Sequence, residues 1–272
     1  MSLNEVEQIL QKRGISPNKV LGQNFLIEPS LYPKLANYAA LDRSNVVLDA
    51  GAGFGFLARF LSDKCKAVIA VEKDPVVTSV LREQVKSISN ITVVEGDVLK
   101  VELPRFNKVI SLPPYYLSTD LVLWILKKKV DCAVLVVQKE FAERLTAPVG
   151  VEQYSWLTVV VTNLAEFQIL DSVPKELFHP VPEVDSVILT IKPHTTEQFQ
   201  VKDPAAFTRL VKSLFTERNK KLAKAITPYL KSNLKLDKAA SERLAQTLPY
   251  RTRRVRELSP HEFGEIANAL PN

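Results

Sequence analysis

The sequence predicts an α/β fold with a mainly parallel sheet, followed by a smaller all-helical C-terminal domain. Between residues 45 and 192, short and continuously apolar runs such as "AVIAVEKD" and "CAVLVVQ" alternate with segments of helical spacing. Strands separated by helices of about 10–15 residues are typical of β-α-β units and a parallel sheet. Apolar runs without in–out alternation favour a sheet that is covered on both faces.

The elements of the first domain follow one another in a regular order. Strands are expected at "NVVLDAGAG", "AVIAVEKD", "ITVVEGD", "KVISL" and "CAVLVVQ", and helices at "FLARFLSDKC" and "PVVTSVLREQVKSI". Two later strands, "EFQILDSV" and "SVILTIKP", lack the alternation with helices and indicate an antiparallel pair at the edge of the sheet.

The character of the chain changes after Pro193, where a polar stretch is followed by helical patterns without a clear strand. Helices are expected at "DPAAFTRLVKSLFTERNKKLAKAI", "DKAASERLAQTL" and "SPHEFGEIANAL". Each begins with Asp, Ser or a Ser-Pro pair, residues that favour the start of a helix. We therefore predict two domains, residues 1–194 and residues 195–272.

Composition fits a globular protein, because 46% of the 272 residues are hydrophobic and 24% are charged. No apolar run approaches the roughly 20 residues that span a bilayer, and the charged start "MSLNEVEQILQKRG" argues against a secretory signal. The two cysteines and three histidines have no metal-ligand spacing. We expect a cytoplasmic protein without a membrane segment or a metal, and a monomer.

Positive charge is concentrated near the C-terminus. The stretch from Lys202 to Glu257 holds 15 Lys or Arg against 5 Asp or Glu, a net charge of +10 in a chain whose total is +6. A basic segment on a mildly acidic body favours a polyanionic partner, of which nucleic acid is the first candidate. The alternative is a lysine-rich helical face that is only solvated.

Three predicted strands end in residues that suit a nucleoside ligand. The first ends in a G-x-G-x-G loop that contains Gly51 and Gly53, and glycines let the backbone approach a ligand closely. The second ends in Glu72, a carboxylate placed to accept hydrogen bonds from ribose hydroxyls. The third ends in Asp97, which suits the amino group of an adenine ring. All three lie where open α/β sheets bind ligands.

The charge of Asp49, directly before the glycines, distinguishes between cofactors. A pyrophosphate would be repelled by an acid so close to its cradle, whereas a ligand with an ammonium group would be attracted. This favours S-adenosylmethionine over a nicotinamide cofactor. A tight strand-to-helix turn would explain the glycines alone, but it does not explain the two acids on the next strands.

The stretch "VISLPPYYLST" follows the fourth strand and contains Leu112, Pro113, Pro114 and Tyr115. Enzymes that methylate amino groups of bases carry Asp, Asn or Ser there, then two prolines and an aromatic residue. A side-chain oxygen and a backbone carbonyl accept the amino hydrogens, and the aromatic ring stacks on the base. Here the Pro113 carbonyl and the Tyr115 ring are available, but Leu112 offers no acceptor. Ser111 could substitute if the loop shifts, or the prolines could form only a rigid turn.

Several longer motifs occur together and in one order. They are "LGQNFL", "DAGAGFGFL", "VEKD", "GDVL", "QKEFAERLTAPVG", "FHPVPEVDSVIL", "LFTERNKKL" and "LSPHEFGEIANAL". From about residue 15 to residue 270, the chain resembles the small-subunit ribosomal RNA adenine N6,N6-dimethyltransferase family (KsgA-type). The resemblance implies a Rossmann-like methyltransferase sheet that binds S-adenosylmethionine, with a helical basic domain that binds rRNA.

The resemblance also implies roles for individual residues. Cofactor contacts are expected from Gln23, Asn24, Leu26, Asp49, Gly51, Gly53, Glu72, Asp97, Val98 and Leu112. The catalytic loop would be Leu112, Pro113, Pro114 and Tyr115. The chain departs from the family at this loop, because Leu112 stands at the family's asparagine and Pro113 at its leucine.

The implied activity is methyl transfer to adenosines near the 3′ end of small-subunit rRNA, with the immature small ribosomal subunit as partner. Phosphate contacts are expected from Arg218, Lys220, Lys221, Arg251, Arg253, Arg254 and Arg256. Because Leu112 departs from the family, an RNA-binding assembly factor with weak or single methylation is the alternative. A DNA adenine methyltransferase is a third possibility that the family-specific C-terminal motifs oppose.

Overall fold

The computed structural model describes residues 2–18 and 20–271, which form two compact units. The first unit comprises Met1–Ala142 and Phe167–Pro193, and the second comprises Glu143–Glu166 and His194–Asn272. The chain passes between units at Pro193, next to the expected boundary. The segment Glu143–Glu166, expected in the first domain, belongs instead to the second unit.

This reassignment has a packing cause. Helix α7 (Trp156–Thr162) lies in the reassigned segment and packs against helices α8 (Pro204–Phe215) and α12 (Pro260–Ala269). Tyr154, which is 1% exposed, donates its hydroxyl to the Leu258 carbonyl at 2.8 Å. Periodicity in a sequence does not show which distant helix a segment packs on, so the expected boundary missed this insertion.

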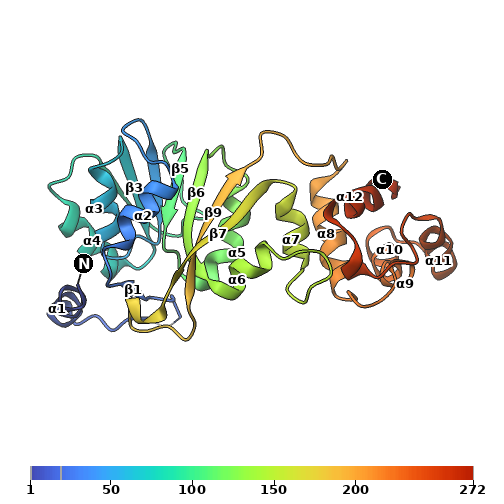
Figure 1. Ribbon diagram of the computed structural model, residues 1–272, viewed down its shortest axis with the longest axis horizontal. Coiled ribbons are helices and arrows are strands. Elements are labelled where there is room, and N and C mark those ends of the chain that lie inside the picture. The colour runs from blue at the N-terminus through green and yellow to red at the C-terminus, as the bar shows by residue number, and fades with distance from the viewer. Residues whose placement is uncertain (1, 19, 272) are drawn as a thin grey trace. The chain divides into compact units, whose positions relative to one another are not determined.

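A seven-stranded sheet forms the body of the first unit, with the strand order β4-β3-β2-β5-β6-β9-β7 (Figure 1). Strands β4, β3, β2, β5 and β6 are parallel, and β9 is antiparallel to β6. This confirms the predicted α/β fold. The strands are β2 (Val46–Ala50), β3 (Ala67–Glu72), β4 (Ile91–Glu95), β5 (Lys108–Ser111), β6 (Cys132–Gln138), β7 (Ala165–Val173) and β9 (Ser186–Pro193).

Helices connect the parallel strands, and right-handed crossovers place α3 and α4 on one face of the sheet and α5 on the other. Helix α4 begins where the Asp74 carboxylate accepts the Val76 N–H at 2.9 Å, and Pro75 occupies its first position. The helices of this region are α1 (Leu3–Arg13), α2 (Leu31–Tyr38), α3 (Phe56–Ser62), α4 (Pro75–Val85), α5 (Ser118–Ile125) and α6 (Lys139–Leu145). Short 3-10 turns lie at Tyr115–Leu117 and Lys175–Leu177.

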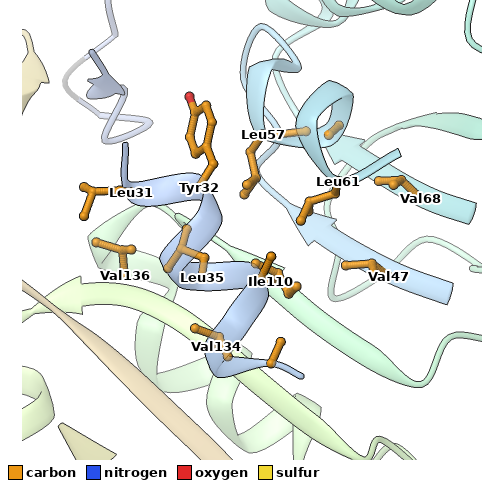
Figure 2. Packing of buried hydrophobic residues seen from close by; sticks show 14 of the residues in the cluster. Leu31, Tyr32, Leu35, Val47, Leu57, Leu61, Val68, Ile110, Val134 and Val136 are labelled. Atoms are coloured by element: carbon orange, nitrogen blue, oxygen red, sulfur yellow. The ribbon is translucent and has the colours of Figure 1, made fainter. Parts of the chain in front are cut away.

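The core between α2, α3 and the sheet is built from aliphatic side chains. Figure 2 shows Leu35 of α2 and Leu61 of α3 among side chains of the strands, including Ile110 of β5. These three side chains are fully buried, and each contributes about 1.5–3 kcal/mol relative to an exposed position. The packing holds the strands in register and thereby fixes where their carboxyl ends lie.

The second unit is helical, as its sequence predicts, but the helix expected from Asp203 to Ile226 is interrupted. Helix α8 ends at Phe215, and the next residues pair with another segment instead, where the Val255 N–H donates to the Lys220 carbonyl at 3.1 Å. The remaining elements are α9 (Leu222–Ala225), α10 (Thr227–Asn233), α11 (Lys238–Thr247) and a 3-10 turn at Val255–Glu257. Within residues 2–18 and 20–271, no helix is long and apolar enough to cross a bilayer.

Candidate cofactor and acceptor site

A cleft with an empty volume of about 850 Å³, partly open to solvent, lies at the carboxyl ends of the parallel strands. The loops after β2, β3, β4 and β5 contribute to it, and the strand order reverses between β2 and β5, where α/β sheets bind ligands. Most residues predicted for the site meet there. They are Gln23, Asn24, Gly51, Gly53, Glu72, Asp97, Val98, Leu112, Pro113, Pro114 and Tyr115.

Glu72, at the end of β3, is held by backbone groups. One carboxylate oxygen accepts the Gly53 N–H at 2.9 Å, and the other accepts the N–H groups of Lys73 and Asp74 at 2.8 and 2.9 Å. Burial raises the pKa of Glu72 above its usual value, although these three hydrogen bonds oppose the shift. Because a carboxylate has about four lone-pair sites, Glu72 keeps capacity for a ribose hydroxyl beside the glycine loop.

Asp97 follows the end of β4 and stands beside the buried side chain of Val98. Its carboxylate accepts the Leu99 N–H at 3.1 Å and lies 3.4 Å from the half-exposed Lys73 ammonium group. An acceptor next to an apolar wall suits the amino edge and the flat face of a purine.

The segment before β1 (Phe25–Leu26) forms another wall of the cleft. The Gln23 side chain accepts the Asn18 N–H and donates to the Asp74 carboxylate, both at 2.8 Å. Phe25 stacks on Phe54 with ring centroids 4.2 Å apart, and β1 pairs with β8 (Phe178–His179). Gln23 and Asn24 therefore line the cleft.

Two residues predicted to contact the cofactor are not on the cleft surface. Leu26 is 5% exposed and belongs to the hydrophobic core cluster of the first unit. Asp49 is 1% exposed and lies within β2, with one carboxylate oxygen that no described residue contacts by a hydrogen bond. Both positions differ from the expectation of direct contact.

Burial, and secondly the charge of Glu72, raises the pKa of Asp49 to about 8. A group whose pKa is higher in the folded than in the unfolded chain binds protons more tightly when folded. Its contribution to stability is present below the unfolded pKa near 4 and is lost as the pH rises to about 8. A cationic ligand in the neighbouring cleft would oppose this loss by favouring the ionised carboxylate.

We expect Asp49→Asn to become more stable relative to wild type as the pH rises from 5 to 8. Between the unfolded and folded pKa values each pH unit is worth about 1.4 kcal/mol. At about 2–4 °C per kcal/mol for a protein of this size, the difference in melting temperature should grow by roughly 3–6 °C for each pH unit. Calorimetry of the ligand-free proteins at pH 5 and pH 8 measures this difference in melting temperature. The free-energy cost of burying the introduced amide does not depend on pH, so it cancels in the comparison. Asp63→Asn, at an exposed carboxyl, controls for net charge; a difference for Asp49→Asn that does not vary with pH would refute the assignment.

Residues 112–115, which we call the proline loop, pack directly on Gly51 and Gly22. A Cβ atom on Gly51 would lie 2.9 Å from Cδ of Pro114, and one on Gly22 would lie 3.2 Å from its Cβ. The Tyr115 hydroxyl lies 2.7 Å from the Ser186 hydroxyl at the start of β9, which fixes the tyrosine ring. No described donor contacts the carbonyl of Pro113, so this oxygen is available to a ligand.

Ser111 does not replace the acceptor that Leu112 lacks. Its side chain is fully buried, and its hydroxyl donates to the Ala50 carbonyl at 2.7 Å and accepts the Ala50 N–H at 3.2 Å. These bonds tie β5 to β2 and point the hydroxyl into the sheet. The structure therefore contradicts that alternative, while Leu112 itself lines the cleft.

Some residues of the cleft were not predicted from the sequence. Tyr116, 53% exposed, and the buried Phe178 both line it. Phe178 stands in the motif "FHPVPEVDSVIL", but the two-residue strand β8 is too short to give a pattern. Tyr116 directly follows Tyr115 in the sequence, and this adjacency to the proline motif was the available signal.

The seven basic residues predicted for RNA lie in two segments of the second unit, at 218–221 and 251–256. These segments run antiparallel, with a bridge between Lys221 and Arg254 and a 3.0 Å bond from the Arg256 N–H to the Arg218 carbonyl. The pairing gathers Arg218, Lys220, Lys221, Arg251, Arg253, Arg254 and Arg256.

Their side chains differ in what they contact. The Arg218 guanidinium donates to the Glu152 and Val151 carbonyls at 2.8 and 3.0 Å, and Arg253 pairs with Glu262. Arg254 donates to the Asn219 carbonyl, and Lys220 pairs with Glu217 at 2.8 Å. The exposed cations without such contacts to described residues are Lys221, Arg251 and Arg256.

Comparison with known proteins shows the family of the chain. The family model for "Ribosomal RNA adenine dimethylase" matches residues 15–267. The chain is 37% identical to a "Probable ribosomal RNA small subunit methyltransferase A" of Methanosarcina acetivorans, over 97% of each chain. It is 35% identical to the protein of that name in Pyrococcus abyssi, over 96% of this chain and 95% of the relative.

Two solved structures resemble the fold. A dimethyladenosine transferase from Plasmodium falciparum gives a TM-score of 0.76 at 27% identity, covering 88% of this chain and 94% of its own. The 23S rRNA methyltransferase ErmE gives 0.66 at 26% identity, covering 91% and 99%. With a family model that spans nearly the whole chain and relatives above 30% identity, the chain belongs to the ribosomal RNA adenine dimethylase family.

Proposed function

We propose that this protein transfers methyl groups from S-adenosylmethionine to N6 of adenosines near the 3′ end of small-subunit rRNA. It acts as a monomer on the immature small ribosomal subunit. One observation carries the proposal: a single cleft joins the two carboxylates suited to a nucleoside cofactor, Glu72 and Asp97, to the proline loop that ends in Tyr115.

The residues of the cleft fit the cofactor. Glu72 would hold the ribose, Asp97 the adenine amino group, and Gln23 and Asn24 the methionine end. When bound, S-adenosylmethionine supplies an electrophilic methyl group on a sulfonium ion.

The proline loop would hold the acceptor. The target base leaves its stack and lies on the Tyr115 ring, while the Pro113 carbonyl accepts an N6–H hydrogen bond. This directs the nitrogen lone pair at the methyl carbon. The N–C bond would form as the C–S bond of the bound cofactor breaks with its electron pair left on sulfur, and the nitrogen would then lose a proton to solvent. The Pro113 carbonyl stabilises the positive charge that develops on the nitrogen.

The second unit would bind the phosphate backbone of the rRNA. Lys221, Arg251 and Arg256 are exposed cations on two adjoining segments. Phosphate contacts supply affinity and register but little choice of sequence. Selection of the adenosine therefore rests on RNA shape and on a base that can be turned out of a loop.

A substrate competition tests the proposal. The protein is incubated with labelled S-adenosylmethionine and equal amounts of immature small subunits, large subunits and duplex DNA. We expect label in adenosines of small-subunit rRNA. Preferential labelling of large-subunit rRNA or of DNA, or absence of label from all three, would contradict the assignment.

A further inference from the structure

A second concavity of the first unit has the features of a nucleic-acid surface. It is formed by residues 99–106, which follow β4, together with Trp124, Lys128 and Lys129 at the end of α5. We call these residues the α5 groove. Its empty volume is about 1580 Å³, part of it open to solvent. The reaction proposed above uses no residue of this groove.

Two of the residues that line the α5 groove have stacked aromatic rings. Phe106 and Trp124 stack with centroids 6.0 Å apart and an angle of 18° between their planes. The Lys128 ammonium group lies 4.6 Å from the centre of the Trp124 ring. The rings hold this cation above an apolar surface, where its attraction to an anion is less weakened by water than on an open face.

The walls of the α5 groove are basic. The residues that line the groove include four cations, Lys100, Arg105, Lys128 and Lys129, and one carboxylate, Glu102, which gives them a net charge of +3. All four cations are exposed, and none forms an ion pair with a described carboxylate. Outside the stretch from Lys202 to Glu257 the chain carries a net charge of −4. A basic cluster on this acidic background is therefore not a result of overall composition.

Helix-end electrostatics do not explain the cluster. Lys128 and Lys129 follow the C-terminal end of α5, where cations offset the partial charge of the last carbonyl groups. Lys100 and Arg105, however, come from the separate segment after β4. Cations from two segments that converge on one concavity indicate an external anionic ligand.

The α5 groove and the cofactor and acceptor cleft lie at opposite ends of helix α5. Val98 lines the cleft and the next residue, Leu99, lines the groove. Helix α5 also connects the two sites, because the cleft residue Leu117 directly precedes the helix and the groove residue Lys128 follows it. Its eight residues span about 12 Å. A strand-binding surface contacts about 4–16 nucleotides, so a single RNA strand is long enough to reach both sites.

We propose that the α5 groove binds backbone phosphates of the RNA strand whose adenosine enters the cleft. The identity of this RNA rests on the proposed function, but the groove's affinity for RNA does not depend on catalysis. The residues of the groove belong to the first unit, which would hold the cofactor, whereas the basic residues predicted for RNA belong to the second unit. Its phosphate contacts lower the KM for RNA and leave the transfer step unchanged.

The test compares two charge-matched double variants of the full chain. Lys128→Glu with Lys129→Glu alters the groove, and Lys64→Glu with Lys66→Glu is the control. The control lysines are also exposed, and Lys64 likewise lies over a ring, 5.0 Å from the centre of Phe60. Binding of a fluorescent 3′-terminal fragment of small-subunit rRNA is measured by anisotropy across a series of KCl concentrations.

The groove variant is expected to bind the fragment roughly tenfold more weakly near physiological salt. The slope of log affinity against log salt should fall in magnitude by about 1.4, as for two lost phosphate contacts on a single strand. Calorimetry should give unchanged affinity for S-adenosylmethionine, and kcat at saturating RNA should stay the same. Lys128→Gln with Lys129→Gln gives a smaller change in the same direction and replaces the Glu variant if that variant does not fold.

Wild-type affinity in the groove variant, or an equal loss in the control, would overturn the proposal. Loss of binding to assembled subunits with unchanged binding to the naked fragment would also overturn it, because the groove would then contact a ribosomal protein. If the wild type binds the fragment through the groove but transfers no methyl group to any rRNA, the proposed function fails and the groove assignment stands.

Discussion

Replacing Leu112 by asparagine is expected to raise the rate of methyl transfer about 10²- to 10³-fold. Leu112 lines the cleft directly before Pro113, where amino-methylating enzymes carry a side-chain acceptor, and Ser111 is turned into the sheet. A hydrogen bond made chiefly in the transition state is worth a factor of this size. Single-turnover transfer with saturating cofactor and small subunits measures the change.

The matched control is Leu112→Met, which keeps an apolar side chain of similar volume and should transfer at the wild-type rate. Asparagine also gives up the contact between Leu112 and the core, so the Asn variant should be less stable even though it is faster. If Leu112→Asn is no faster than Leu112→Met, the rate of methyl transfer is not limited by the missing side-chain acceptor at this position.

Gly51→Ala is expected to lower kcat/KM about 100-fold. Gly51 has a φ of +86°, which is unfavourable for alanine, and the added Cβ would lie 2.9 Å from Cδ of Pro114. The proline loop must then move, and a displacement of about 1 Å at a reacting centre can cost a factor of 10². Affinity for S-adenosylmethionine should fall as well, because the same glycine lines the cleft.

Gly150→Ala separates backbone strain from the steric effect. Gly150 has a similar φ of +90°, but a Cβ there would meet no atom within 4 Å. This variant should lose a little stability and no activity. Equal losses of activity in both variants, or near-wild-type activity of Gly51→Ala, would show that the contact between Gly51 and Pro114 does not position the loop.

The fold of the first unit could be predicted because local signals and global packing agree. Most residues of the strands β2 to β6 are apolar, Glu72 is the last residue of β3, and Asp97 lies two residues after the end of β4. Once the strands are parallel, these carboxylates must meet at one edge of the sheet. The prediction of the family, the fold and the methyltransferase activity is confirmed by the family match and the solved structures.

Other features depend on contacts between distant residues. The sequence does not show that Tyr154 bonds to Leu258, so the segment Glu143–Glu166 was placed in the wrong unit. The helical pattern after Phe215 gives way because the following residues pair with 251–256. A helical period predicts a helix only where no competing partner takes its hydrogen bonds.

Burial inside the site was likewise not predictable from residue type. Asp49 and Leu26 match the positions of cofactor-binding residues, yet both lie beneath the cleft surface. Arg218 and Arg253 look like RNA contacts, but their guanidinium groups support neighbouring loops. Residue type and spacing predicted which residues lie near each site. Which way each side chain points depends on three-dimensional packing.

The most direct test is a single turnover. Protein loaded with one equivalent of methyl-labelled S-adenosylmethionine is mixed with excess immature small subunits, and the rRNA nucleosides are analysed by mass spectrometry. The label is predicted to appear in N6-methylated adenosine from the 3′ region of the rRNA. Retention of the label on bound cofactor, or its appearance on another base or another atom of adenosine, would contradict the account.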